Sequence, residues 1–394
     1  MEKMKYIILL LNILIIIGFG AVQGTWGADV TLTPKIDLTG QYDDNVSFER
    51  GDKKDEDYLY QIQPAITFDY KTEINRLVAE AILDYQNYIN NDNFNAFNTT
   101  CKLEGDSNFT ELLTLFTDLK YIRDNTLESQ LEEEGKVQAR QDRDRYDLRG
   151  GLFLNVTELI RIGGDYRYRQ TNYEENYPED YNDDDVSFIY NQRLRNQLDS
   201  LTFRTSYAFR EVRDKETNTY RALFGWTRDF SERFRFGASI GGRFTEQYEY
   251  NSNTERQKNE TTGLLADFNF TRNTEIMRTN LNYHLDQVSV AEGEERNVHS
   301  FKIKLDRNIT ERFRFGIDLK YYLSSNLNKD SKDDSSQFYE VKPSIIYNLT
   351  EYHLLGLFYS YQYEFDDSRG GADSKDANRN RVWITLSFNF PRKL

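Results

Sequence analysis

Basic side chains recur at every second residue in several stretches of this chain, and they are the residues best suited to act on a solute. After Glu232 the sequence RFRFGASIGGRF holds three arginines at one parity, with Phe, Ala, Ile and Gly at the other. After Glu311 the sequence RFRFGIDLK repeats the pattern. A period of two is that of a β-strand, whose successive side chains point to opposite faces. These cations should therefore gather on one face of a sheet, where they would attract anions.

The charged residues of this polar face are candidates for the lining of a pore. The basic candidates are Arg161, Arg167, Arg193, Arg195, Arg204, Arg233, Arg235, Arg243, Arg278, Lys302, Lys304, Arg312 and Arg314, and the acidic candidates are Asp118, Asp165 and Asp318. Rings of charged side chains set the ion preference of a channel. The bias towards arginine next to the turns predicts a preference for anionic solutes. The alternative is a lumen cross-braced by salt bridges with no open pathway.

Histidine is scarce, which argues against hydrolytic chemistry. The chain has three histidines, at positions 284, 299 and 353. A hydrolase at the rim of a pore would need a histidine beside a serine or an aspartate. His284 shares the polar face with Asp286, but parity puts His299 on the apolar face, so the two histidines should not meet. We therefore expect no enzyme activity, no catalytic residues and no cofactor.

Aspartate runs occur in the stretches between the alternating segments. The run Asp183-Asp184-Asp185 lacks the spaced ligands and the central glycine of an EF-hand loop. We predict that it belongs to a solvated acidic loop and that the chain holds no metal site. Weak bridging by divalent cations to anionic outer-leaflet lipid is the alternative. The acidic connections are predicted at 52–57, 127–144, 174–185, 329–334 and 366–376.

Seven Thr-Glu or Ser-Glu pairs punctuate the sequence just before strand-like runs. They are Thr72-Glu73, Thr110-Glu111, Thr157-Glu158, Ser231-Glu232, Thr274-Glu275, Thr310-Glu311 and Thr350-Glu351. Their glutamates are 36 to 47 residues apart, except for one gap of 74 that holds Asp199-Ser200 near its middle. This spacing fits a strand, a loop, a returning strand and a tight turn. Thr and Asn suit such turns because their side chains bond to the local backbone.

Strands on both sides of each turn number about eighteen. They are predicted at 31–48, 58–70, 75–89, 97–106, 111–124, 144–155, 158–171, 186–198, 200–213, 217–229, 233–250, 258–271, 275–288, 298–308, 312–325, 337–348, 352–366 and 380–390. The segment 97–106 alternates poorly, so sixteen strands is the alternative. Strands of globular proteins average about 5 or 6 residues, whereas long alternating strands rich in aromatics are typical of membrane barrels. The sequence therefore predicts an all-β, transmembrane, antiparallel up-and-down barrel.

The N-terminal segment has the features of an export signal. Two lysines precede an apolar stretch from Tyr6 to Ile17, and small residues follow it. We predict that residues 1–27 are a secretory signal peptide, cleaved after Gly24 or Gly27. Residues 28–394 would then form the barrel. The mean hydropathy of -0.77 excludes a helical membrane protein, and the aromatic fraction of 14% is too high for a disordered chain. These features predict the bacterial outer membrane as the location.

The last predicted strand carries a more specific signal. In VWITLSFNF, residues 382–390, Val, Ile, Leu and Phe share one parity. This resembles the C-terminal signal by which outer-membrane barrels are inserted, which ends in an aromatic residue. The resemblance implies the barrel assembly machinery as a partner, beside outer-membrane lipid and lipopolysaccharide. Four further residues, from Pro391 to Leu394, extend beyond the signal and depart from its usual ending.

The start of the predicted barrel resembles a known family. The stretch TPKIDLTGQYDDNVSF runs from Thr33 to Phe48 and contains Tyr42-Asp43-Asp44-Asn45. A proline-led strand with this ending is similar to the opening of the outer-membrane β-barrel porins called beta-barrel porin 2. The resemblance implies a barrel whose substrate is poorly defined, set in some relatives near exopolysaccharide export. It transfers no catalytic residue.

Three functions remain open from the sequence. The first is a porin-like channel for small hydrophilic or anionic solutes, saccharides included. The second is a conduit that exports an acidic exopolysaccharide, guided by the arginine-lined lumen. The third is a plugged structural or adhesive barrel that works through its acidic loops. No nucleic-acid partner is expected.

Overall fold

The part of the chain that the structure describes consists almost entirely of β-strands. The computed structural model describes residues 27–51, 54–125, 141–174, 180–213, 215–250, 256–289, 295–326, 335–366 and 376–394. The strands are β1 (Asp29–Asp43), β2 (Asp57–Lys71), β3 (Asn75–Tyr88), β4 (Ala96–Asn108), β5 (Leu113–Asn125), β6 (Asp142–Asn155), β7 (Ile160–Tyr173), β8 (Tyr181–Arg193), β9 (Asp199–Val212), β10 (Lys215–Ser231), β11 (Phe234–Tyr250), β12 (Arg256–Asn273), β13 (Met277–Ser289), β14 (Glu295–Asn308), β15 (Phe313–Asn326), β16 (Ser335–Asn348), β17 (His353–Asp366), β18 (Ala377–Asn389) and β19 (Arg392–Lys393). One turn of 3-10 helix, η1 (Asp92–Phe94), lies between β3 and β4.

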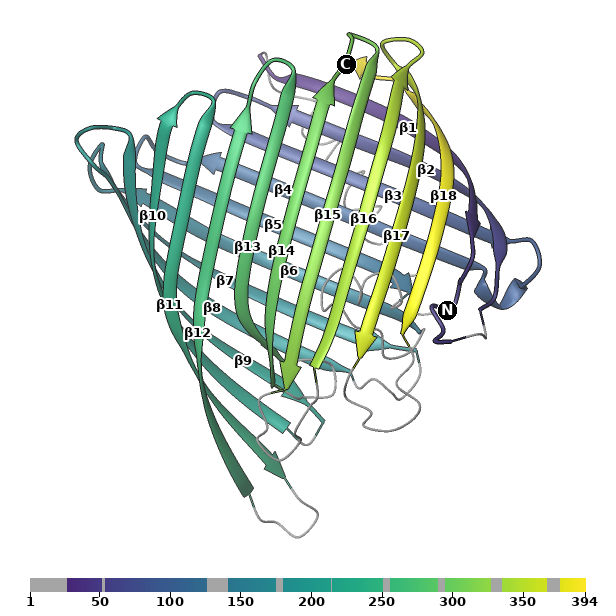
Figure 1. The fold of residues 1–394 in the computed structure, drawn as a ribbon. Coiled ribbons are helices and arrows are strands. Elements are labelled where there is room, and N and C mark those ends of the chain that lie inside the picture. Colours follow the sequence, from purple (N-terminus) through teal and green to yellow (C-terminus); the bar gives the residue numbers. More distant parts are fainter. Residues whose placement is uncertain are drawn as a thin grey trace.

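The strands form one closed antiparallel sheet (Figure 1). Each of β1 to β18 pairs with its neighbours in sequence, and β1 pairs with both β2 and β18. The closing register of nine residue pairs ends with Asp43 opposite Arg381. After Pro391, β19 continues the pairing, with Arg392 opposite Leu32. Closure removes the free sheet edge, whose unpaired backbone groups would not be viable within lipid.

The eighteen predicted strands are present, with ends shifted by a few residues. The poorly alternating segment 97–106 belongs to β4, which pairs with both β3 and β5. The eighteen-stranded prediction is therefore confirmed, and the sixteen-stranded alternative is wrong. The predicted strand 31–48 is wrong at its end, because β1 stops at Asp43 and the chain leaves the sheet there.

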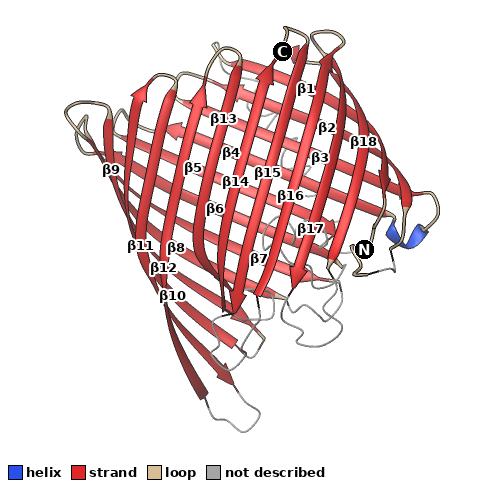
Figure 2. Ribbon diagram, in the orientation of Figure 1, coloured by secondary structure: helices blue, strands red, loops and turns tan. Residues whose placement is uncertain are grey.

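The short turns lie at one end of the barrel, where the C-terminus also lies (Figure 2). In each Thr-Glu turn the threonine hydroxyl accepts a backbone N–H from the residue three positions on; for Thr310 the donor is Phe313, at 3.0 Å. In the 74-residue gap the corresponding turn is made by Asn196, whose Oδ1 accepts the N–H of Asp199 at 3.1 Å. The predicted turn chemistry is confirmed. Short turns face the periplasm in bacterial barrels.

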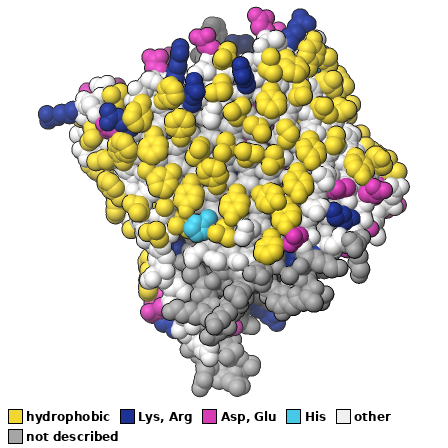
Figure 3. All heavy atoms as spheres, viewed as in Figure 1, with side chains coloured by type: hydrophobic (Ala, Val, Ile, Leu, Met, Phe, Trp, Pro, Cys, Tyr) yellow, Lys and Arg dark blue, Asp and Glu magenta, His cyan; other side chains and the backbone are white. Residues whose placement is uncertain are grey.

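The outer face carries the apolar half of the strands. Ile240 and Phe224 lie in mid-strand, yet they are 59% and 52% exposed. Apolar side chains cover the visible face in a broad band, and Lys, Arg, Asp and Glu gather at its upper rim (Figure 3). Such a band beside a polar interior is what a lipid environment requires. Among the described residues, no helix is long and apolar enough to cross a membrane.

Several sequence predictions fall outside the described residues. The signal peptide lies there, since the description begins at residue 27. Most of the acidic connections predicted at 127–144, 329–334 and 366–376 lie there too.

Candidate functional site

A cavity of about 790 Å³ lies in the lumen, lined by strands β6 to β13. Seven arginines face it and define what we call the arginine wall. They are Arg149, Arg167, Arg169, Arg204, Arg210, Arg221 and Arg243. Five aspartates also line the cavity, so with His284 neutral the lining carries two more positive than negative formal charges. The lining of this cavity thus carries charges of both signs, with cations in excess.

The extracellular half of the arginine wall is a network of cross-strand ion pairs. Arg167 Nε donates to Asp147 Oδ1 at 2.7 Å. Arg210 Nε lies 2.5 Å from Asp183 Oδ1, and Arg169 Nη1 lies 3.5 Å from Asp183 Oδ2. One carboxylate therefore holds guanidinium groups from two different strands. Bonds of this kind fix the orientation of the arginines in advance of any solute.

Deeper in the wall the arginines are held more loosely. Arg149 Nε donates to Asp165 Oδ2 at 3.0 Å, and Ser187 Oγ donates to Asp165 Oδ1 at 2.6 Å. Arg204 Nη2 is 3.9 Å from Asp165 Oδ1, and its side chain is 43% exposed. Arg221 Nη1 is 3.4 Å from Asp185 Oδ2. Arg204 thus presents much of its guanidinium group to the cavity while a carboxylate steadies it.

His284 belongs to a small polar cluster on the opposite side of the same cavity. Its ring is hydrogen-bonded to Asp267, and Ser239 Oγ donates to Asp267 Oδ2 at 2.9 Å. Its Nε2 is 3.8 Å from Asp286 Oδ2. In a serine hydrolase the histidine accepts the serine proton, whereas here serine and histidine both contact the carboxylate. Among the described residues, no group of three or more His, Cys, Asp and Glu is arranged to hold a metal ion.

The two histidines of the β13–β14 hairpin lie on opposite faces, as parity predicts. His284 is opposite Ser300 in the register, and His299 is opposite Leu285. His299 Nδ1 is 3.0 Å from the hydroxyl of Tyr283, which also points outward. His353 starts β17 beside a short turn and stacks edge-on against Phe388.

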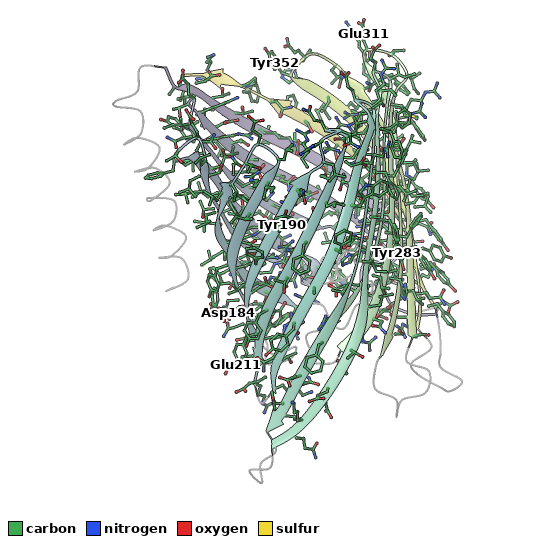
Figure 4. The ribbon with its side chains drawn as sticks, turned by 90° about the vertical axis from the view of Figure 1, so that its left-hand side faces the viewer. Asp184, Tyr190, Glu211, Tyr283, Glu311 and Tyr352 are labelled. Atoms are coloured by element: carbon green, nitrogen blue, oxygen red, sulfur yellow. The ribbon has the colours of Figure 1, made fainter. Side chains whose placement is uncertain are left out.

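The aspartate run Asp183-Asp184-Asp185 is in a strand, so its assignment to a loop was wrong. β8 starts at Tyr181, and Asp183 and Asp185 line the cavity. Asp184 points outward and hydrogen-bonds Tyr166; Figure 4 shows it near Glu211, at the end opposite the short turns. Aspartate disfavours strands, but opposite charges across strands stabilise the pairing, and arginines of β7, β9 and β10 supply those charges.

Two aromatic rings also enter the lumen, near the short-turn end of β5 and β6. Phe116 and Phe153 stack with their centroids 5.4 Å apart. Arg161 lies over the Phe153 ring, 4.1 Å from its centroid. The rings have room because glycine faces them: a Cβ at Gly163 would lie 2.3 Å from the Phe153 ring. An apolar surface thus lies beside cations in an otherwise polar interior.

The predicted lining residues fall into two groups. Arg167, Arg204, Arg243 and Asp165 lie on the cavity, and Asp118 lies on a neighbouring hollow of about 190 Å³. Lys302, Lys304 and Asp318 lie on the inward faces of β14 and β15, with Lys304 directly opposite Asp318.

The second group lies at the short-turn end. Its members are within two residues of a strand end or in a turn, and they are Arg161, Arg193, Arg195, Arg233, Arg235, Arg278, Arg312 and Arg314. Arg195, Arg233 and Arg312 are in the turns themselves, so their placement on inward strand positions was wrong. The turns begin earlier or end later than the hydrophobic alternation suggests. These arginines share this mouth of the barrel with the glutamates of the short turns, so the rim carries charges of both signs (Figure 3).

Among the charged residues of the cavity, Arg149, Arg221, Asp183 and Asp185 were not placed on the inward face from the sequence. Arg149 shares its inward parity with Asp147 and Gly151, and Arg221 shares its own with Leu223 and Gly225. Parity alone would have found both. Asp183 and Asp185 were missed because they were assigned to a loop.

The closed sheet, its apolar exterior and its charged interior define a membrane-spanning β-barrel of the outer-membrane type. No known family model and no curated protein matches the sequence.

Among solved structures, OccK2 (OpdF) of Pseudomonas aeruginosa is 10% identical, covering 92% of this chain and 98% of that one, with a TM-score of 0.46. OccAB1 of Acinetobacter baumannii is 10% identical, covering 93% and 97%, with a TM-score of 0.49. The outer membrane channel DcaP of Acinetobacter baumannii is 9% identical, covering 92% and 98%, with a TM-score of 0.47. These likenesses are distant, and the proposals below rest on the barrel's own residues.

Proposed function

We propose that the protein is an outer-membrane channel that passes small hydrophilic, anionic solutes along the arginine wall. The observation that carries the proposal is the cavity of about 790 Å³ with seven arginines and five aspartates on its lining. Barrels of about this strand number commonly enclose an aqueous lumen. An excess of fixed cations in a narrow lumen raises the local concentration of anions.

The wall is suited to passage rather than tight capture. Its guanidinium groups are held by carboxylates such as Asp183 and Asp165 and so need little rearrangement when a solute arrives. The same carboxylates weaken the attraction of each arginine for an anion. Conduction needs binding that is favourable enough for entry and weak enough for exit. Alternating cations and anions along one wall meet both needs.

Purified protein in planar lipid bilayers tests this function. The expected result is a steady conductance with a reversal potential that shows anion preference in a KCl gradient. Arg204→Gln should reduce this preference, because it removes a charge that faces the cavity. Arg272→Gln is the matched control: Arg272 points outward and packs over the Phe234 ring at 5.3 Å. No conductance, or cation preference in the wild type, would contradict the proposal.

Export of an acidic polysaccharide is the second candidate. It is favoured by the stacked rings of Phe116 and Phe153 beside Arg161, since an aromatic face suits the apolar face of a sugar ring and the cation suits its carboxylate. A linear uronic-acid polymer should then block the current transiently. Phe116→Ala should shorten these blocks while leaving chloride conductance unchanged.

Further proposals concern the export and assembly of the protein, its family and its contact with lipid. The signal peptide at residues 1–27 and the recognition of 382–390 by the barrel assembly machinery stay predictions. The pairing of residues 381–389 with β1 supports the second of them. Membership of the beta-barrel porin 2 family rests on the stretch from Thr33 to Phe48. Contact with lipopolysaccharide, bridged by divalent cations, is proposed for the outward acidic residues at the long-connection end, such as Asp184 and Glu211.

A further inference from the structure

The chain between β1 and β2 turns into the barrel instead of leaving it. Residues 44–51 follow β1 at the end opposite the short turns. Within this segment Asn45 and Val46 are fully buried, and Phe48 is only 5% exposed. A loop that projected into solvent would leave these side chains accessible. We call residues 44–51 the inner loop.

One side of the inner loop packs against the wall made by β14, β15, β16 and β18. Phe48 forms a buried cluster with Val298, Tyr322, Phe338 and Ala377. The Phe48 and Phe338 rings meet edge-on with centroids 6.5 Å apart. Tyr322 and Phe338 lie directly opposite each other in the register, on the face away from the lipid. The contact is therefore inside the lumen.

The other side of the inner loop packs against β2 and β3. Val46 contacts Leu59 and Tyr88, with Phe94 of η1 against the same cluster. Leu59 lies between Tyr58 and Tyr60, which are both exposed on the outer face. Leu59 must therefore point inward. The inner loop thus contacts the inner wall on both sides of the β1–β18 closure: β14 to β16 on one side, and β2 and β3 on the other.

Polar contacts fix the inner loop to β18 across the closing strand pair. The Asp43 carboxylate accepts hydrogen bonds from Arg379 Nε at 2.9 and 3.0 Å. Asp44 accepts the N–H of Asn380 at 2.6 Å. Asn45 Nδ2 donates to the carbonyl of Asn378 at 2.9 Å. Three successive residues of the loop entry therefore bond to three successive residues of the last long strand.

The inner loop is also held within itself. Asn45 Nδ2 donates to the carbonyl of Glu49 at 2.8 Å, and Asn45 Oδ1 accepts the N–H of Glu49 at 2.9 Å. Phe48 adopts a φ of 56°, in the left-handed region. A non-glycine residue there costs about 1–2 kcal/mol, so its ring must gain more by packing. A loop that floated freely would not hold this conformation.

We propose that the inner loop is a fixed constriction that sets the size limit of the channel and confines solutes to the arginine wall. The inference rests on the proposed channel function. The inner loop contacts the lumen face of β14, β15, β16, β18, β2 and β3 near their ends opposite the short turns, whereas the cavity is lined by β6 to β13. The segment Asp43-Asp44-Asn45 supplies the bonds that hold the constriction in place.

The first experiment asks whether the inner loop stays on the wall in the membrane. Arg50 and Ala377 form an isolated antiparallel bridge, a pairing in which Cα atoms are about 4.5–5.5 Å apart, within disulfide reach. Cysteines at both positions, in a Cys101→Ala background, should form a disulfide on oxidation and leave conductance unchanged. Failure to form the disulfide would overturn the proposal, because the loop would then lie elsewhere.

The second experiment releases the loop. Replacing Val46, Ser47 and Phe48 by Gly-Ser-Gly should raise single-channel conductance about twofold, as expected for a wider pore, and admit larger neutral sugars in liposome swelling. Glu49→Cys in the same Cys101→Ala background avoids any loss of packing. Bulky thiol reagents at this exposed position should lower the conductance. Unchanged conductance in the folded release variant, or in labelled Glu49→Cys, would overturn the proposal.

The two proposals fail in different ways. If the wild type passes no current but the release variant does, the channel proposal fails as stated and the inner loop is a complete plug. If the wild type conducts with anion preference and the release variant is identical, only the constriction fails. The comparison of neutral-sugar entry is independent of charge, so loss of anion preference does not affect it.

Discussion

The two sides of the lumen hold the same kinds of charged residue in opposite surroundings. At the closing strands, Arg379 and Asp43 pair with side chains 2% and 0% exposed. On the arginine wall, Arg204 faces the cavity with 43% of its side chain exposed, although its partner Asp165 is buried. Burial, rather than residue type, therefore separates an arginine that holds the barrel together from one that meets a solute.

This difference has a direct energetic meaning. Removing one member of a buried pair leaves a charge without water or a counter-ion, which costs about 3–5 kcal/mol. An exposed pair keeps its water and contributes about 0–1 kcal/mol. Substitution of Arg379 or Asp43 should therefore change stability, whereas substitution of Arg204 should change selectivity.

The largest expected effect is that of Arg379→Ala. The free energy of unfolding should fall by about 3–5 kcal/mol, because Asp43 would stay buried with no cation beside it. Urea unfolding in lipid vesicles, followed by tryptophan fluorescence, measures the change. The double variant with Asp43→Ala should be more stable than the single one. A loss below about 1 kcal/mol would show that this buried pair contributes no more to the free energy of unfolding than an exposed pair does.

Phe48 gives the next largest effect and separates packing from backbone strain. Phe48→Ala should lower the free energy of unfolding by about 3 kcal/mol, through loss of the buried ring. Phe48→Gly loses the same ring but relieves the left-handed φ, so it should be less destabilised than the alanine variant by up to about 1 kcal/mol. The reverse order in the same unfolding assay would show that the loop is not held in this conformation.

On the arginine wall the stability change should be small. Arg204→Gln should alter the free energy of unfolding by less than about 1 kcal/mol, because its charge is already hydrated. Its effect on anion preference should persist in the same preparation. A stability loss comparable to that of Arg379→Ala would remove the distinction between the two sides.

Salt concentration should affect the two sides of the lumen differently, even without a substitution on the arginine wall. Raising the ionic strength from about 0.1 M to 1 M shortens the Debye length from about 10 to 3 Å. Anion preference at the hydrated wall should weaken accordingly, as reversal potentials at matched gradients would show. The stability difference between wild type and Arg379→Ala should stay nearly constant, since ions do not reach the buried pair. Equal sensitivity of both quantities would contradict this picture.

The barrel itself could be predicted from the sequence because its signals are local. Alternation over ten or more residues marks each strand, and a threonine hydroxyl that bonds three residues ahead marks most turns. β4 was the exception: its alternation is weak, and only its pairing with β3 and β5 decides between sixteen and eighteen strands.

The contact between the loop entry and β18 was less accessible, because its partners are distant in sequence. Asp43 and Arg379 are 336 residues apart, and nothing in the alternation of either strand indicates that they meet. Asp183 was missed for another reason: its aspartate run has the composition of a loop, and the arginines that pair with it, Arg169 and Arg210, lie on the two adjacent strands. The inner loop was read as part of β1, since Val46 and Phe48 continue the strand's parity after the strand has ended.

The bonds between the loop entry and β18 have a consequence for the order of assembly. Asp43, Asp44 and Asn45 find their partners at residues 378–380, which are among the last of the chain to be made. Until the final strand docks beside the first, these groups lack their partners on β18, and only contacts within the loop and with β2 and β3 can hold the loop inward. The lumen of the nascent barrel should therefore be widest just before the barrel closes. Closure should then fix the inner loop in its place as the constriction.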